Sequence, residues 1–121
     1  MNIAIAEDEA EIRQFFQSAL QRLGHQVVAA AQNGRELIEQ CRVRCPDLII
    51  TDIQMPEIDG IEATRRICCE RPVPVILISA CDPTEVSGRE GIANVVAFLV
   101  KPVKISDLKS AITKATGCAS A

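Results

Sequence analysis

The segment DLIITDIQMPEIDG, residues 47–60, decides the fold. Its apolar run, Leu48–Ile50, lies between Pro46 and a Met-Pro loop, which predicts a short strand that is buried on both faces. Strands of this kind belong to parallel sheets that helices cover on both sides. Asp52 stands where the strand ends, and in open α/β sheets ligands bind beyond the carboxyl ends of the strands. We therefore expect Asp52 to be a functional carboxylate.

Four further apolar runs of strand length flank this segment, and helical patterns separate them. Together with the strand at Leu48, the expected strands are residues 2–6, 27–31, 75–79 and 95–100. Expected helices run to about Leu23, from Asn33 to Pro46, from Gly60 through Cys68, from Asp82 onward and from Ser106 to Gly117. The alternation predicts an α/β fold: a flavodoxin-like, doubly wound, five-stranded parallel sheet in the order 2-1-3-4-5, with five helices.

Local signals place the helix ends. Asp8, Asn33 and Ser106 are the expected N-caps, and Glu36 completes a capping box with Asn33. The inner face of the second helix is expected to include Cys45.

Composition narrows the class of protein. A chain of 121 residues that is 48% hydrophobic and 24% charged is expected to form one domain, residues 1–121, with residues 117–121 as a tail or the start of a linker. The net charge of -3 and the lack of a basic run argue against binding to nucleic acid or to a membrane. The six cysteines lack zinc-ligand spacing, so most are expected to be buried in a reducing cytoplasm, and His25 is expected at the surface.

Five polar residues follow the ends of the expected strands. Glu7 and Asp8 follow the first strand, Asp52 ends the third, Ser79 the fourth, and Lys101 follows the fifth. Strands one and three are neighbours at the switch point, so the three carboxylates converge there. Unpaired carboxylates repel one another, and Mg²⁺, which prefers oxygen ligands, resolves that repulsion.

Lys101 would pair with Asp52 at rest and with a phosphoryl oxygen when one arrives, and Ser79 could donate to another oxygen. As a carboxylate nucleophile, Asp52 would form an acyl phosphate. Each signal has a plainer interpretation when taken alone: Asp8 as only a helix cap, Phe98 as only a core residue.

In combination, these residues resemble the receiver domain of two-component response regulators (the CheY-like family) along nearly the whole chain. The resemblance rests on the acidic pair Glu7-Asp8, the Asp52 loop, Ser79-Ala80, and Phe98 three residues before Lys101-Pro102. It implies Asp52 as phosphoacceptor, with Lys101 and Ser79 in the same site. It also implies Mg²⁺ held by Asp8, Asp52, the Gln54 backbone carbonyl and, largely through water, Glu7.

The resemblance further implies a cis Lys101-Pro102 bond. Glu7 and Ser79 depart from the family, which more often has Asp and Thr there. After phosphorylation, Ser79 would move toward the phosphate and Phe98 would rotate inward. The altered surface would comprise the fourth expected helix, the fifth strand and the fifth helix, and would carry partner binding or a homodimer. The phosphodonor would be a sensor histidine kinase or a histidine phosphotransfer protein in a bacterial cytoplasm.

On this interpretation the chain is a signalling domain, and its only catalysis is its own phosphotransfer and slow autodephosphorylation. Two alternatives remain open. One is a degenerate receiver that acts as a dimerisation or docking module without phosphorylation. The other is an aspartyl phosphatase, although Gln54 stands where a general acid would be needed. Residues 7–9 and 52–60 also resemble receivers of RNA-binding antiterminators, so the output and any domain after Ala121 stay open.

Overall fold

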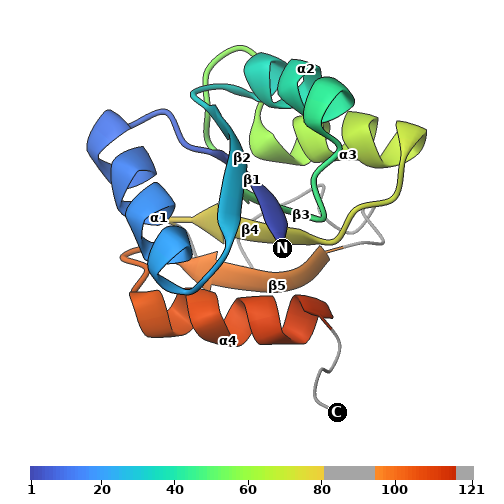
Figure 1. The fold of residues 1–121 in the computed structure, drawn as a ribbon. Coiled ribbons are helices and arrows are strands. Elements are labelled where there is room, and N and C mark those ends of the chain that lie inside the picture. The colour runs from blue at the N-terminus through green and yellow to red at the C-terminus, as the bar shows by residue number, and fades with distance from the viewer. Residues whose placement is uncertain (81–94, 117–121) are drawn as a thin grey trace.

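The computed structural model describes residues 1–80 and 95–116, and in these residues five parallel strands form one sheet in the order β2-β1-β3-β4-β5. The strands are β1 (Asn2–Ala6), β2 (Gln26–Ala31), β3 (Leu48–Asp52), β4 (Val75–Ser79) and β5 (Val95–Val100). The helices of this part are α1 (Ala10–Arg22), α2 (Gly34–Arg44), α3 (Gly60–Glu70) and α4 (Ile105–Thr116). The predicted flavodoxin-like fold and strand order are confirmed (Figure 1). The helix expected from Asp82 lies outside the described residues.

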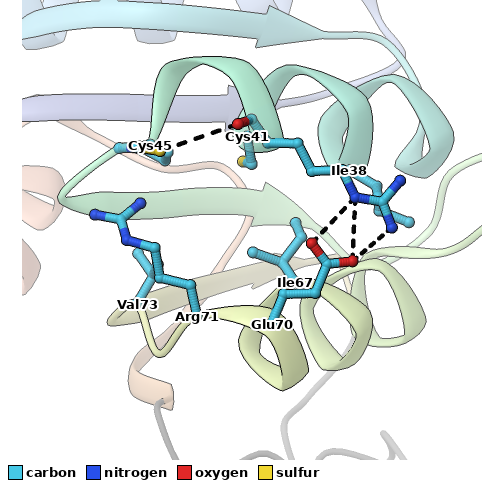
Figure 2. A pocket seen from close by; sticks show the side chains of 9 residues that line it. Ile38, Cys41, Cys45, Ile67, Glu70, Arg71 and Val73 are labelled. Carbon is cyan, nitrogen blue, oxygen red and sulfur yellow. Dashed lines mark hydrogen bonds and ion pairs between the residues drawn. The ribbon is translucent and has the colours of Figure 1, made fainter.

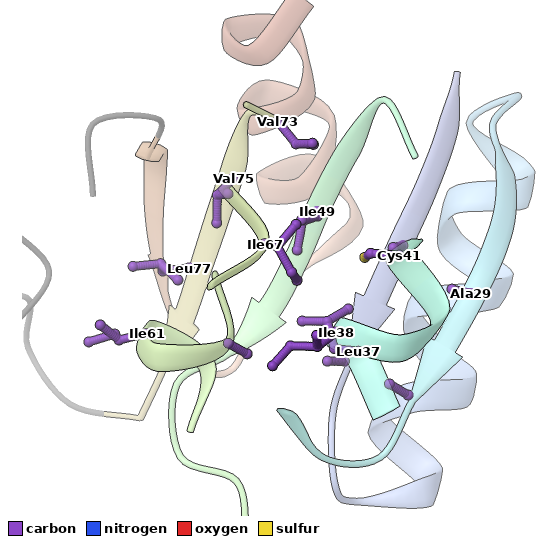
Figure 3. Close-up of a cluster of buried hydrophobic side chains, with 14 of the residues drawn as sticks. Ala29, Leu37, Ile38, Cys41, Ile49, Ile61, Ile67, Val73, Val75 and Leu77 are labelled. Carbon is purple, nitrogen blue, oxygen red and sulfur yellow. The ribbon is translucent and has the colours of Figure 1, made fainter. Parts of the chain in front are cut away.

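Helices cover the sheet on both faces, with α2 and α3 on one and α1 and α4 on the other (Figure 1). On the first face, α2 packs mainly against β1 and β2 and contributes Leu37, Ile38 and Cys41, and α3 packs against β4 and contributes Ile61 and Ile67 (Figure 3). On the second face, Phe16 and Leu20 of α1 and Leu108 of α4 belong to a second cluster, together with buried residues of β1, β3 and β4. All five residues of β3 and of β4 are buried. This double burial explains why both strands are continuous apolar runs.

One helix start agrees with the sequence prediction and another differs from it. α2 begins as predicted, because the Asn33 side chain accepts the Glu36 N–H at 2.8 Å. Ser106 is not an N-cap, since α4 begins one residue earlier, at Ile105. There the Asp107 carboxylate accepts the Lys104 N–H at 2.9 Å, which is the contact that the third residue of a helix makes in a capping box.

The expected burial of most cysteines is wrong for the described ones. Cys41 is buried, Cys68 is half-buried, and Cys45 and Cys69 are exposed. Cys45 lies at the C-cap of α2 in a left-handed conformation rather than on the inner face, because the following Pro46 disfavours a helical conformation before it. His25 is also not simply a surface residue: it is half-buried, and its Nδ1 lies 3.1 Å from the Met1 amino group.

Candidate functional site

Asp52 is held on all sides at the carboxyl end of β3. Asp52 as a whole is only 3% exposed to solvent. The Gln54 N–H donates to Asp52 Oδ1 at 3.3 Å, and Lys101 Nζ donates to Oδ2 at 2.9 Å. The Thr51 hydroxyl donates to the Asp52 carbonyl oxygen at 2.9 Å. One carboxylate oxygen thus faces a backbone amide and the other faces a cation.

The start of α3 closes against the backbone of the same residue. A Cβ atom on Gly60 would lie 2.0 Å from the Asp52 carbonyl oxygen, far inside van der Waals contact. The Gly60 N–H donates to the Ile53 carbonyl at 2.8 Å. In the sequence, Gly60 marks the expected start of a helix after a turn. Its close approach to Asp52 is a tertiary contact that the pattern does not encode.

Glu7 lies beside Asp52 because β1 is the neighbour of β3. The residue is fully buried, and its Oε1 lies 3.1 Å from Lys101 Nζ. This contact is an ion pair, and Oε1 has no partner with hydrogen-bond geometry. Oε2 accepts the Glu9 N–H at 3.1 Å. Lys101 therefore bridges two buried carboxylates, Glu7 and Asp52.

Asp8 is exposed at the mouth of this cluster. The prediction that it caps α1 is wrong: Glu9 occupies the N-cap position, and no side chain caps the helix. The turn before α1 is instead held by Glu7, whose carboxylate accepts the Glu9 N–H and whose carbonyl accepts from Arg13 Nη1 at 2.8 Å. No sequence motif indicates a role for Arg13, because an arginine in the first turn of a helix is usually an exposed cation.

Burial sets the electrostatics of the cluster. It raises the pKa of Glu7 to about 7, and the charge of Asp52 adds to this, while the Glu9 amide and Lys101 act in the opposite direction. Burial by itself lowers the pKa of Lys101, but its close contacts with the charged Asp52 and Glu7 outweigh this effect, so the pKa lies above its usual value. Lys101 thus stays charged, and one lysine faces more than one acid.

The cluster suits a hard cation. Glu7, Asp8 and Asp52 each offer a carboxylate oxygen, and these atoms lie within 4.8 Å of one another. All three donors are oxygen, and Glu7 Oε1 is a buried oxygen without a hydrogen-bond partner. Mg²⁺ prefers such donors and is typically held by one or two carboxylates and several waters. The residues therefore fit the magnesium site that the sequence predicts.

The remaining predicted residues come to the same edge from β4 and β5. Ser79 is fully buried at the end of β4, one residue beyond the partner of Asp52 in the sheet register. Its carbonyl accepts the Lys101 N–H at 2.9 Å, which fixes where Lys101 leaves β5. The Lys101–Pro102 bond is cis. Phe98 is half-buried on β5 and packs against the cluster under α2 and α3.

A separate cavity of about 180 Å³ lies between the C-terminal ends of α2 and α3 (Figure 2). Apolar side chains and Cys41 line it, and an ion pair between Arg42 and Glu70 crosses its rim. Pro46 and Val73, which precede β3 and β4, place it at the amino edge of the sheet, opposite Asp52. It has no part in the carboxylate site.

Comparison with known proteins supports the same interpretation. The family model described as "Response regulator receiver domain" matches residues 3–113. The chain is 39% identical over 110 residues to the transcriptional regulatory protein PdtaR of Mycobacterium tuberculosis (strain CDC 1551 / Oshkosh), covering 91% of this chain and 54% of that protein. It is 35% identical over 106 residues to a protein-glutamate methylesterase/protein-glutamine glutaminase of Archaeoglobus fulgidus, covering 84% of this chain and 30% of the enzyme.

Among solved structures, the signal receiver domain of the putative response regulator NarL from Mycobacterium tuberculosis superposes with a TM-score of 0.85 at 27% identity. The match covers 97% of each chain. By contrast, the chain spans about half, or less, of the length of the two curated relatives above. Within residues 1–80 and 95–116, no helix has the length and apolar character needed to cross a membrane.

Proposed function

This chain belongs to the response regulator receiver domain family, and we propose that Asp52 is its phosphoacceptor, receiving a phosphoryl group from a phosphohistidine on a sensor kinase or a phosphotransfer protein. The observation that carries the proposal is the position of Lys101 Nζ, 2.9 Å from Asp52 and 3.1 Å from Glu7, with Asp8 beside them. A buried acid with a fixed cation and two further acids at one sheet edge is the arrangement that aspartyl phosphate chemistry needs.

At rest, Lys101 and the Gln54 amide hold the Asp52 carboxylate in one orientation. The carboxylate attacks the incoming phosphorus, the bond to the donor nitrogen breaks, and Lys101 turns to an oxygen of the transferred group. Glu7, Asp8, Asp52 and the Gln54 carbonyl would hold Mg²⁺. When bound, Mg²⁺ neutralises charge on the phosphoryl oxygens. Ser79, at the end of the adjacent strand, would donate a hydrogen bond to the phosphate.

Phosphorylation would act on the rest of the domain through Ser79 and Phe98. It adds about 1.5 to 2 negative charges and strong acceptors at Asp52. In our proposal Ser79 moves toward them and Phe98 turns inward from β5. The face that changes comprises the helix expected from Asp82, strand β5 and helix α4, and it serves partner binding or homodimerisation. We propose that residues 1–121 make one such domain, acting in the cytoplasm without contact to nucleic acid or membrane.

The phosphodonor protein would dock against α1. Phe15 is 39% exposed, and with Ile12, Pro102 and Val103 it lines an apolar groove of about 400 Å³. Lys101 lines the same groove, so a domain seated there lies directly beside the acceptor site. Phe15→Ala is expected to slow transfer from a phosphohistidine protein and to leave phosphorylation by a small donor unchanged.

The test of acceptor function uses phosphoramidate, a small donor, with Mg²⁺. We expect the intact mass to increase by one phosphoryl group in the wild type and to stay unchanged in Asp52→Asn. A wild type that stays unmodified would support the alternative, a receiver that docks without phosphorylation. Steady turnover of a phosphate ester, in excess over protein, would indicate a phosphatase instead.

A further inference from the structure

The loop Ile53–Asp59, which joins β3 to α3, is held from outside by the first turn of α2. The Gly34 N–H donates to the Ile58 carbonyl at 3.1 Å. A Cβ atom on Gly34 would lie 2.1 Å from that carbonyl oxygen and 2.8 Å from its carbon. No side chain fits there, so glycine is required by the close approach of two backbones rather than by a left-handed conformation.

The same turn of α2 is itself rigid. The Asn33 side chain accepts the Glu36 N–H, and the Glu36 carboxylate reaches back to the Gln32 N–H at 3.1 Å. These two bonds fix the helix start as a capping box does, except that the Glu36 carboxylate accepts from Gln32 rather than from the N-cap residue Asn33. Leu37, one turn on, is fully buried. A loop that bonds to Gly34 is therefore tied to a fixed element.

On the other side, the loop carries groups of the acceptor site. Its residue Gln54 donates its N–H to Asp52 Oδ1, and Gly60, which follows the loop, lies against the Asp52 carbonyl. Met55 and Ile58 of the loop pack against the core cluster that α2 and α3 share with the sheet. A displacement of Ile58 would thus be passed to Gln54 and to the position of the Asp52 carboxylate.

We propose that Gly34 is a positioning residue for the Asp52 site: by having no side chain, it lets α2 hold the Ile53–Asp59 loop in the arrangement that binds Mg²⁺. The inference rests on the proposed acceptor function but concerns a residue of another element, outside the acidic cluster. Groups that support metal ligands typically change metal affinity by about 10- to 100-fold when they are altered.

The experiment compares Mg²⁺ binding by isothermal titration calorimetry, a method suited to a chain without Trp or Tyr. Gly34→Ala is expected to weaken Mg²⁺ binding by about 10-fold. The matched control is Gly24→Ala, in the turn after α1. Its φ of 92° makes alanine strained, but a Cβ there meets no atom within 4 Å. That variant should lose stability and keep the wild-type Mg²⁺ affinity.

Equal Mg²⁺ affinity in Gly34→Ala and the wild type would overturn the inference, even if the variant is less stable. If Gly34→Ala does not fold, hydrogen exchange of the Gly34 amide in the wild type decides: added Mg²⁺ should slow the exchange, and an unchanged rate would overturn the inference. Failure of the proposed function looks different, because the wild type itself would then stay unmodified by phosphoramidate and Mg²⁺, whatever its Mg²⁺ affinity.

Discussion

Replacing Glu7 by glutamine should stabilise the metal-free protein. Glu7 is fully buried beside Asp52, and burial raises its pKa from 4.5 to about 7. At 1.36 kcal/mol for each pKa unit, the ionised carboxylate destabilises the fold by up to about 3 kcal/mol. Glutamine has the shape of the neutral acid and carries no charge. We therefore expect Glu7→Gln to raise the free energy of unfolding by about 1 to 3 kcal/mol above pH 7.

The sign of the pH dependence follows from the direction of the shift. Because the pKa of Glu7 is higher in the folded state, its contribution to stability is fully present below pH 4.5 and is lost as the pH rises through about 7. The advantage of Glu7→Gln should therefore vanish below pH 4.5. Urea unfolding followed by circular dichroism in a chelator measures it. Glu39→Gln, which removes an exposed acid, is the control and should follow the wild type.

Mg²⁺ should reduce the stability advantage of Glu7→Gln over the wild type. A ligand present at 100 times its dissociation constant stabilises the fold by about 2.7 kcal/mol, and Glu7→Gln removes one of the acids that would hold it. The free energy of unfolding should therefore increase more on addition of Mg²⁺ in the wild type than in the variant. If Glu7→Gln is the less stable protein above pH 7 without metal, the reasoning about this cluster is wrong.

Three further changes test the framework around the site. Gly60→Ala would place a Cβ 2.0 Å from the Asp52 carbonyl; it should lower the unfolding free energy by about 1 to 3 kcal/mol and slow phosphorylation, and wild-type kinetics would contradict this. Asn33→Ala removes the α2 cap and should lower the unfolding free energy by about 1 kcal/mol in urea titrations, whereas Asn33→Ser should keep most of it. Burial, and then the charge of the amino terminus, lower the pKa of His25. The stability that this shift contributes is therefore fully present above pH 6.5, the usual pKa of histidine, and is lost as the pH falls through the lowered pKa. His25→Gln should weaken the fall in urea midpoint below pH 6.5, and an unaltered pH profile would count against the contact with Met1.

Strands were the most predictable part of the fold. β1, β4 and β5 have the predicted bounds, because each is a continuous run of apolar residues in the sequence. Burial on both faces explains this run in β4 and in most of β1, whereas β5 is half-buried. The meeting of Glu7, Asp8, Asp52 and Lys101 was also predictable. Parallel strands deliver the residues at their carboxyl ends to one edge, whatever their distance along the chain.

Contacts between elements were not predictable in this way. Asp8 and Ser106 had the right residue type for caps, but Glu7 and Asp107 bond the relevant backbone amides instead. Glu7 accepts the amide of a residue two positions later, and Asp107 accepts the amide of a residue three positions earlier. Helix-cap propensities do not rank such competing acceptors. The approach of Gly34 to Ile58 depends on how α2 packs beside the loop, which no local pattern encodes.

The most direct test of the central claim is the chemical identity of the modified residue. After treatment with a small phosphodonor and Mg²⁺, borohydride reduces an acyl phosphate to an alcohol, and peptide mapping then locates it. The account predicts homoserine at position 52 and at no other acid, with none when Mg²⁺ is omitted. Phosphate recovered on Ser79 or on another residue, with Asp52 intact, would contradict it.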